Sequence, residues 1–161
     1  MSATGSARAE GTAELAAAIA TIADGSRRHI CCFITRAEDE LWSAPALLDA
    51  LRGFVVARSH REVRLLFTEP GGLARDHAAL VALAQRLPSL LMLRQVDAQS
   101  ALPAPQAFVL GDSGEALLFD SGTRAGATHT SDSQRTRPLL QRFDEAWTRA
   151  RPLAEIRSLG I

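Results

Sequence analysis

The strongest constraint on the fold is an alternation of strand and helix patterns between residues 29 and 96. Three apolar runs, at 29–35, 62–68 and 90–96, are predicted to be strands, and the first of them is apolar almost throughout, as strands buried on both faces are. Two segments with apolar residues at helical spacing, 43–58 and 73–88, separate these runs. This order predicts right-handed crossovers and a largely parallel sheet, and therefore an α/β fold.

The pattern changes in the last third of the chain. Two short apolar runs flank Asp112-Ser113-Gly114, which is typical of a β-hairpin, and the segment "GATHTS" indicates one more short strand. A long helix is expected over 131–151, with Phe143 and Trp147 one turn apart on its inner face. We therefore expect a mixed sheet flanked by helices, in a single domain over 12–161 that follows a flexible tail over 1–11.

Charge and composition exclude several classes of function. The 18 basic residues, all arginine, match 18 acidic ones, so the chain has no overall basic field and we expect no nucleic-acid partner, although local patches are compatible with this balance. Without lysine, Schiff-base and P-loop chemistry are excluded. No apolar run is long enough for a membrane span, and no convincing signal peptide is present, so we expect a cytoplasmic protein. The arginine and alanine usage suggests a bacterial source.

Metal, cofactor and disulfide chemistry are not expected either. The four histidines and two cysteines have no metal-ligand spacing, and no motif indicates a cofactor. Cys31 and Cys32 are adjacent, and neighbouring Cα atoms lie about 3.8 Å apart, which is too close for an ordinary disulfide. We expect both thiols to be buried and structural.

The stretch "LPAPQAFVLGD" and the helix containing "FDEAW" carry a resemblance that covers roughly residues 27–158. The order of elements resembles one half of a phospholipase D superfamily protein, whose motif is H-x-K-x-x-x-x-D. When the aspartate of this motif is placed on Asp112, its histidine falls on Pro105 and its lysine on Ala107. The chain also resembles an uncharacterised bacterial domain family associated with acetyltransferase-like proteins.

The resemblance implies a phospholipase D-like half domain that lacks the catalytic pair. In the active superfamily the histidines act as nucleophile and general acid while the lysines stabilise charge on the phosphoryl group. Proline and alanine supply neither function, so the resemblance implies no catalytic residue here. It implies instead a dimerisation, ligand-sensing or regulatory module that forms a homodimer and that has an acetyltransferase-like protein as a further partner.

Three residues are candidates for ligand contact, because they follow strands at the carboxyl edge of the sheet, where open α/β folds bind ligands. They are Arg36, Arg75 and His77. His77 also fits a core histidine, since it lies on the apolar face of its helix, and Arg36 fits a solvated loop. An alternative hypothesis is an enzyme with a rebuilt phosphoryl- or acyl-transfer site that uses His77 with Arg75 or Arg36, which requires these side chains to converge.

Two aromatic residues, Phe143 and Trp147, allow two interpretations. They are most simply core anchors of the C-terminal helix. Because aromatic residues are enriched at interface hot spots, they are also candidates for a surface that binds a partner chain.

Overall fold

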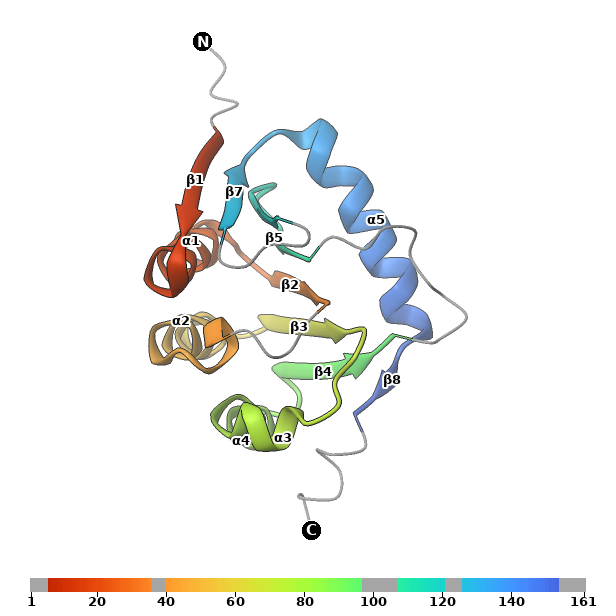
Figure 1. Ribbon diagram of the computed structural model, residues 1–161. Helices are drawn as coiled ribbons and strands as arrows, with labels where there is room; N and C mark the ends of the chain where they lie inside the picture. The colour runs from red at the N-terminus through yellow and green to blue at the C-terminus, as the bar shows by residue number, and fades with distance from the viewer. Residues whose placement is uncertain (1–5, 36–39, 97–106, 121–125, 154–161) are drawn as a thin grey trace.

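The computed structural model describes residues 6–35, 40–96, 107–120 and 126–153. Within them, the strands form one mixed sheet in the order β1-β7-β6-β5-β2-β3-β4-β8 (Figure 1). The strands are β1 Ser6–Glu10, β2 His29–Ile34, β3 Glu62–Phe67, β4 Leu91–Gln95, β5 Phe108–Gly111, β6 Ala116–Phe119, β7 Gly126–Thr130 and β8 Arg151–Pro152.

Helices cover both faces of this sheet. The helices are α1 Gly11–Gly25, α2 Pro45–Ala57, α3 Leu73–Asp76, α4 Ala78–Arg86 and α5 Ser133–Arg149, with a 3₁₀ turn η1 at Glu40–Ser43. Figure 1 shows α1, α2, α3 and α4 on one side of the strands and α5 crossing the other side. Among the described residues, no helix is both long enough and apolar enough to cross a membrane.

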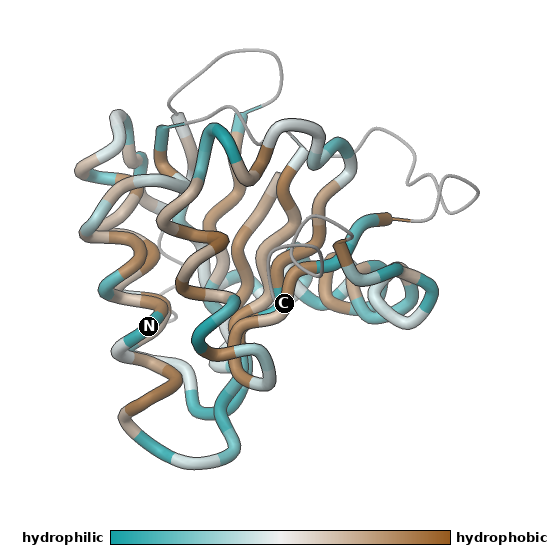
Figure 2. The backbone as a smooth tube through the Cα atoms, turned by 90° about the horizontal axis from the view of Figure 1, so that it is seen from below, coloured by the Kyte–Doolittle hydropathy of each residue, from teal (hydrophilic) through white to brown (hydrophobic). Residues whose placement is uncertain are grey.

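Each face of the sheet has its own hydrophobic core. The larger core packs α1, α2 and α4 on one face through residues such as Ile19, Leu51 and Leu80. The smaller core packs Phe143 and Trp147 of α5 against the other face. Figure 2 shows the hydrophobic segments concentrated in the central strands and on the inner sides of the helices. This arrangement follows from strands that are apolar on both faces.

The sheet confirms the predicted fold class. β2, β3 and β4 pair in parallel, with Ile30 opposite Val63 and Val63 opposite Leu91. β5 and β6 form the antiparallel hairpin predicted around Asp112. β5 also pairs antiparallel with β2. We call the side of the sheet where β2, β3 and β4 end the carboxyl edge, and the opposite side the amino edge. Because β5 runs antiparallel to β2, the beginning of β5 lies at the carboxyl edge.

Two expectations from sequence need correction. The expected tail over 1–11 includes Ser6–Glu10, which forms β1 and pairs antiparallel with β7; residues 1–5 lie outside the described residues. β1 was missed because its short side chains have little strand propensity, and its conformation comes from pairing with a distant strand. The helix expected over 73–88 is interrupted at His77, whose φ of −131° and ψ of 53° are not helical.

Candidate functional site

The carboxyl edge is the first place to look for a site, because open α/β folds bind ligands there and because the resemblance places the motif lysine on Ala107. Phe33 of β2 lies opposite Phe108 of β5, so Ala107 is at this edge, and its carbonyl accepts a hydrogen bond of 3.0 Å from the Phe119 amide. Ala107 presents only a methyl group. Pro105, the position equivalent to the histidine, lies outside the described residues.

Asp112, on which the resemblance places the motif aspartate, makes structural hydrogen bonds at the opposite end of β5. Its two carboxylate oxygens accept hydrogen bonds from the backbone amides of Arg27 and Arg28, at 2.7 and 2.8 Å. These amides directly precede β2. Asp112 therefore fixes the hairpin turn to the start of the central strand, at the amino edge and away from Ala107.

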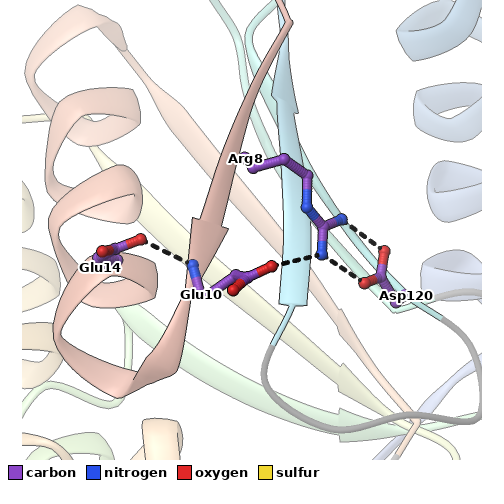
Figure 3. Close-up of polar contacts among 4 residues, drawn as sticks. All are labelled: Arg8, Glu10, Glu14 and Asp120. Carbon is purple, nitrogen blue, oxygen red and sulfur yellow. Dashed lines mark hydrogen bonds and ion pairs between the residues drawn. The ribbon is translucent and has the colours of Figure 1, made fainter.

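A cluster of charged residues joins the N-terminal strand to the end of β6 (Figure 3). The Arg8 guanidinium donates two hydrogen bonds to the Asp120 carboxylate, at 2.9 and 2.8 Å, and one of 3.4 Å to Glu10. Glu14 accepts a hydrogen bond of 2.9 Å from the Glu10 backbone amide. A Cβ on Gly126 would collide with both Arg8 and Asp120, so the pair lies directly over this glycine.

The Arg8–Asp120 pair is neutralised internally. The hydrogen bond to Asp120 raises the pKa of Arg8, and the hydrogen bond from Arg8 lowers the pKa of Asp120. Because Phe119 opposes Ala127 and Ala127 opposes Ala9, this cluster lies at the carboxyl edge. Arg8, the cation of this cluster, is held by Asp120 through two hydrogen bonds and also contacts Glu10.

Two of the predicted ligand residues, Arg75 and His77, lie in different environments. His77 is buried, with 3% of its surface exposed, whereas the Arg75 side chain is 82% exposed and pairs with Asp76 at 3.2 Å. Arg36 lies outside the described residues. Arg75 and His77 therefore lie in different environments, and the form of the rebuilt-enzyme hypothesis that pairs His77 with Arg36 falls outside the described residues.

His77 connects the segments that follow β2 and β3. Its Nδ1 hydrogen-bonds with the Ser43 hydroxyl, which also lies 3.2 Å from the Asp76 carbonyl oxygen. The Ser43 hydroxyl therefore lies between the His77 ring and the backbone of Asp76. This contact holds the buried His77 ring against η1, at the break between α3 and α4.

The other three histidines lie toward the amino edge. His29 lies 3.8 Å from Glu62 at the beginnings of β2 and β3, and His129 lies 3.4 Å from Glu115 beside the hairpin turn. His60 is exposed in the turn that leads to β3, with a φ of 64°. None of these three adjoins Ala107. Within the described residues, no group of three histidine, cysteine or acidic side chains could hold a metal ion.

The two cysteines are free thiols buried in the sheet. Burial raises the pKa of Cys31 to about 12 and raises that of Cys32 well above its usual range. Because the thiolate is the nucleophilic form, both are inert at neutral pH.

Phe143 and Trp147 belong to the core beneath α5. Phe143 is fully buried, stacks on Trp147 at a centroid distance of 5.7 Å and meets Phe108 edge-on at 6.4 Å. Trp147 is 7% exposed, and the Arg94 guanidinium lies 4.2 Å from its ring centroid. In the single chain these two aromatic residues are therefore covered by their own protein.

Sequence reasoning missed the two residues that shape the carboxyl edge, Arg8 and Asp120. Arg8 falls within the expected tail, and no sequence pattern singles out Asp120 at the end of the hairpin. The alternation in "SARAE" and the acid after "ALLF" are weak signals. The two residues can pair only because β1 and β6 lie on either side of β7 in the folded sheet.

The central parallel strands, the antiparallel hairpin and the single long helix across one face define a phospholipase D-like α/β fold. The chain belongs to the family described as a domain of unknown function, DUF7931, whose model matches residues 11–159. No curated protein matches the sequence.

Solved structures of phospholipase D family proteins have the same fold. The phospholipase D family member Nuc from Salmonella typhimurium matches at 12% identity and a TM-score of 0.65, covering 92% of this chain and 97% of its own. NucT from Helicobacter pylori matches at 11% identity and a TM-score of 0.56, covering 92% and 99%.

A third similar structure is TrmBL2, an archaeal chromatin protein that binds DNA. It matches at 15% identity and a TM-score of 0.59 over 92% of this chain. This chain spans about half of TrmBL2, 55% of its length. At these identities the three likenesses show the fold alone.

Proposed function

We propose that this chain is a non-catalytic phospholipase D-like domain that serves as a dimerisation, ligand-sensing or regulatory module in the bacterial cytoplasm. The observation that carries the proposal is the chemistry of the carboxyl edge. There, the position of the superfamily lysine is Ala107, and the adjacent charges of Arg8 and Asp120 are bound to each other.

The placement of the nucleophilic residues supports the absence of catalysis. Phosphodiester transfer in this superfamily needs a nucleophile, a proton donor and cations at one point. In the described residues, His77 is buried against Ser43, three histidines lie toward the amino edge, and the thiols have raised pKa values. The described side chains therefore do not assemble these groups at one place.

The proposed partners are a second copy of this chain and an acetyltransferase-like protein. Because Phe143 and Trp147 are buried in their own core, the pairing surface is expected to use other residues. Light scattering of the purified protein tests the homodimer, for which we expect twice the chain mass of 17.3 kDa. A monomeric mass at all concentrations would overturn the homodimer.

One surface feature favours nucleic-acid binding as a second candidate function. Arg135, Arg142 and Arg149 recur every seven residues on α5, and all three are exposed. At about 3.6 residues per turn they form one stripe along a flank of the helix, with neighbours about 10.5 Å apart. No salt bridge within the described part of the chain involves them.

The composition of this arginine stripe suits a polyanion better than a membrane or an apolar partner. The same flank carries Pro138 and Glu145, and it exposes no large aliphatic or aromatic side chain. Binding there would be electrostatic, as with the phosphates of a nucleic acid. The neutral net charge of the chain makes such binding local and weak.

A fluorescence-anisotropy titration with a labelled DNA duplex tests this candidate. Three phosphate contacts predict a slope of about −2.7 for log K against log salt concentration. The triple variant Arg135→Gln/Arg142→Gln/Arg149→Gln should lose the binding. A control with the same charge change on α2, at the α2 exit and on α4, Arg52→Gln/Arg58→Gln/Arg86→Gln, should retain it. Absence of binding at low salt, or equal loss in both variants, would refute this candidate.

A further inference from the structure

The N-terminal strand is attached to the sheet by few side-chain contacts. Four of the five residues of β1 are exposed, and Ala9 is the buried one. The backbone ladder pairs Ser6 with Thr130 through to Glu10 with Gly126. Beyond this ladder, the hydrogen bonds made by the β1 side chains are those of Arg8 with Asp120 and Glu10. Releasing β1 therefore exposes little apolar surface.

A single residue joins β1 to the rest of the domain. Gly11 follows Glu10 directly and has a φ of +81°, a conformation that favours glycine. The space around Gly11 is open, since a Cβ there would meet nothing within 4 Å. Gly11 is also the first residue of α1, so a change of direction there would break the hydrogen bond of 2.9 Å between the Glu10 amide and Glu14. The model of the DUF7931 family begins at this same residue, so β1 lies outside the segment that defines the family.

The removal of β1 would leave β7 as an open edge strand. Its outward-facing amide and carbonyl groups, now paired with β1, would then be available to another extended segment. The side-chain requirements of that segment are specific. It must place a small residue against the core where Ala9 lies and a cation over Gly126, where it meets Asp120.

We propose that β1 is an exchangeable strand and that its binding site on β7 also accepts β1 of a second copy of this chain. The second copy has the required sequence in the required register, so an exchanged dimer would reproduce every ladder pair and the Arg8–Asp120 pair between chains. Exchange of a terminal element at a short connection is a low-cost route to dimers. This inference rests on the proposed homodimer and specifies how the two copies associate.

Charge reversal gives a test that only exchange satisfies. In an Arg8→Glu chain the β1 side chain repels its own Asp120, and in an Asp120→Arg chain the new cation repels Arg8. When the two variants are mixed, exchange of β1 places opposite charges together at both sites. We expect native mass spectrometry to show a heterodimer in the mixture at several times the abundance of either homodimer.

Two controls isolate the contact. The double variant Arg8→Glu/Asp120→Arg restores an opposite-charge pair within one chain, so it should have the same oligomeric state as the wild type. A mixture of Arg86→Glu and Asp49→Arg chains, which carry the same charge changes away from β1, should give no excess of heterodimer. The absence of a heterodimer from the first mixture, or an equal excess in this control, would overturn the inference.

A second measurement covers the case in which a charge variant does not fold. Ala7 lies opposite His129 across the two strands, so the full chain with Ala7→Cys and His129→Cys can be oxidised at increasing protein concentration. Exchange predicts a crosslinked dimer whose share rises with concentration, and crosslinking within single chains at every concentration would overturn it. A wild-type dimer without exchange would overturn this inference and leave the proposed homodimer intact, whereas a wild type that is monomeric at every concentration would refute both.

Discussion

Replacement of Asp112 tests whether the retained motif residue is structural. Its carboxylate accepts two backbone hydrogen bonds, at 2.7 and 2.8 Å, from Arg27 and Arg28. Hydrogen bonds to a charged group contribute about 1.5–3 kcal/mol each, and solvent exposure reduces this value. We therefore expect Asp112→Ala to lower the free energy of unfolding by about 1–2 kcal/mol. For a chain of this length, this corresponds to a decrease in Tm of about 2–8 °C.

Thermal unfolding followed by circular dichroism measures this effect. Asp112→Asn should lie between wild type and Asp112→Ala, because one amide oxygen replaces two carboxylate oxygens as acceptors. Ser113→Ala, a change in the same exposed turn, is the matched control and should leave Tm nearly unchanged. If Asp112→Ala unfolds within 1 °C of the wild type, on the order of the smallest shift that 0.5 kcal/mol would give, the structural role assigned to Asp112 is refuted.

Three further predictions follow from burial and charge. Cys31 and Cys32 should not react with a thiol reagent at pH 8 in the folded protein, because burial raises the pKa of both thiols. Both should react once denaturant unfolds the protein, and rapid reaction in the native state would contradict this prediction. Phe143→Ala should lower the free energy of unfolding, measured with urea, by about 3–5 kcal/mol, because the ring is fully buried. A decrease below about 1 kcal/mol, the size expected for a surface residue, would contradict the assignment of Phe143 to the core. The wild type should have a higher free energy of unfolding than Asp120→Asn at pH 7, and this difference should shrink as the pH falls below about 4. The reason is that Arg8 lowers the pKa of Asp120 in the folded state, so the stabilisation is lost as the carboxyl group is protonated. A difference that grows as the pH falls would contradict this prediction.

The core of the fold could be predicted from sequence because its signals are local and strong. The apolar runs at 29–35 and 62–68 are buried on both faces, and the turn at Asp112-Ser113-Gly114 lies where a hairpin was expected. Such patterns are set by the burial of neighbouring residues along one segment.

The features that sequence did not predict depend on distant pairing. β1 has little intrinsic strand preference and becomes a strand because β7 offers an open edge. The Arg8–Asp120 pair joins residues 112 positions apart, and no local pattern indicates it. The interruption of the helix at His77 accompanies the contact of its ring with Ser43, which belongs to another segment. Tertiary contacts of this kind override local propensity.

The absence of catalysis is the central claim, and a turnover assay tests it most directly. Purified wild-type protein should hydrolyse bis(p-nitrophenyl) phosphate no faster than buffer. Hydrolysis that co-purifies with the chain and is lost in His77→Ala or His129→Ala would contradict the claim, because it would place an active histidine in a domain that we describe as non-catalytic.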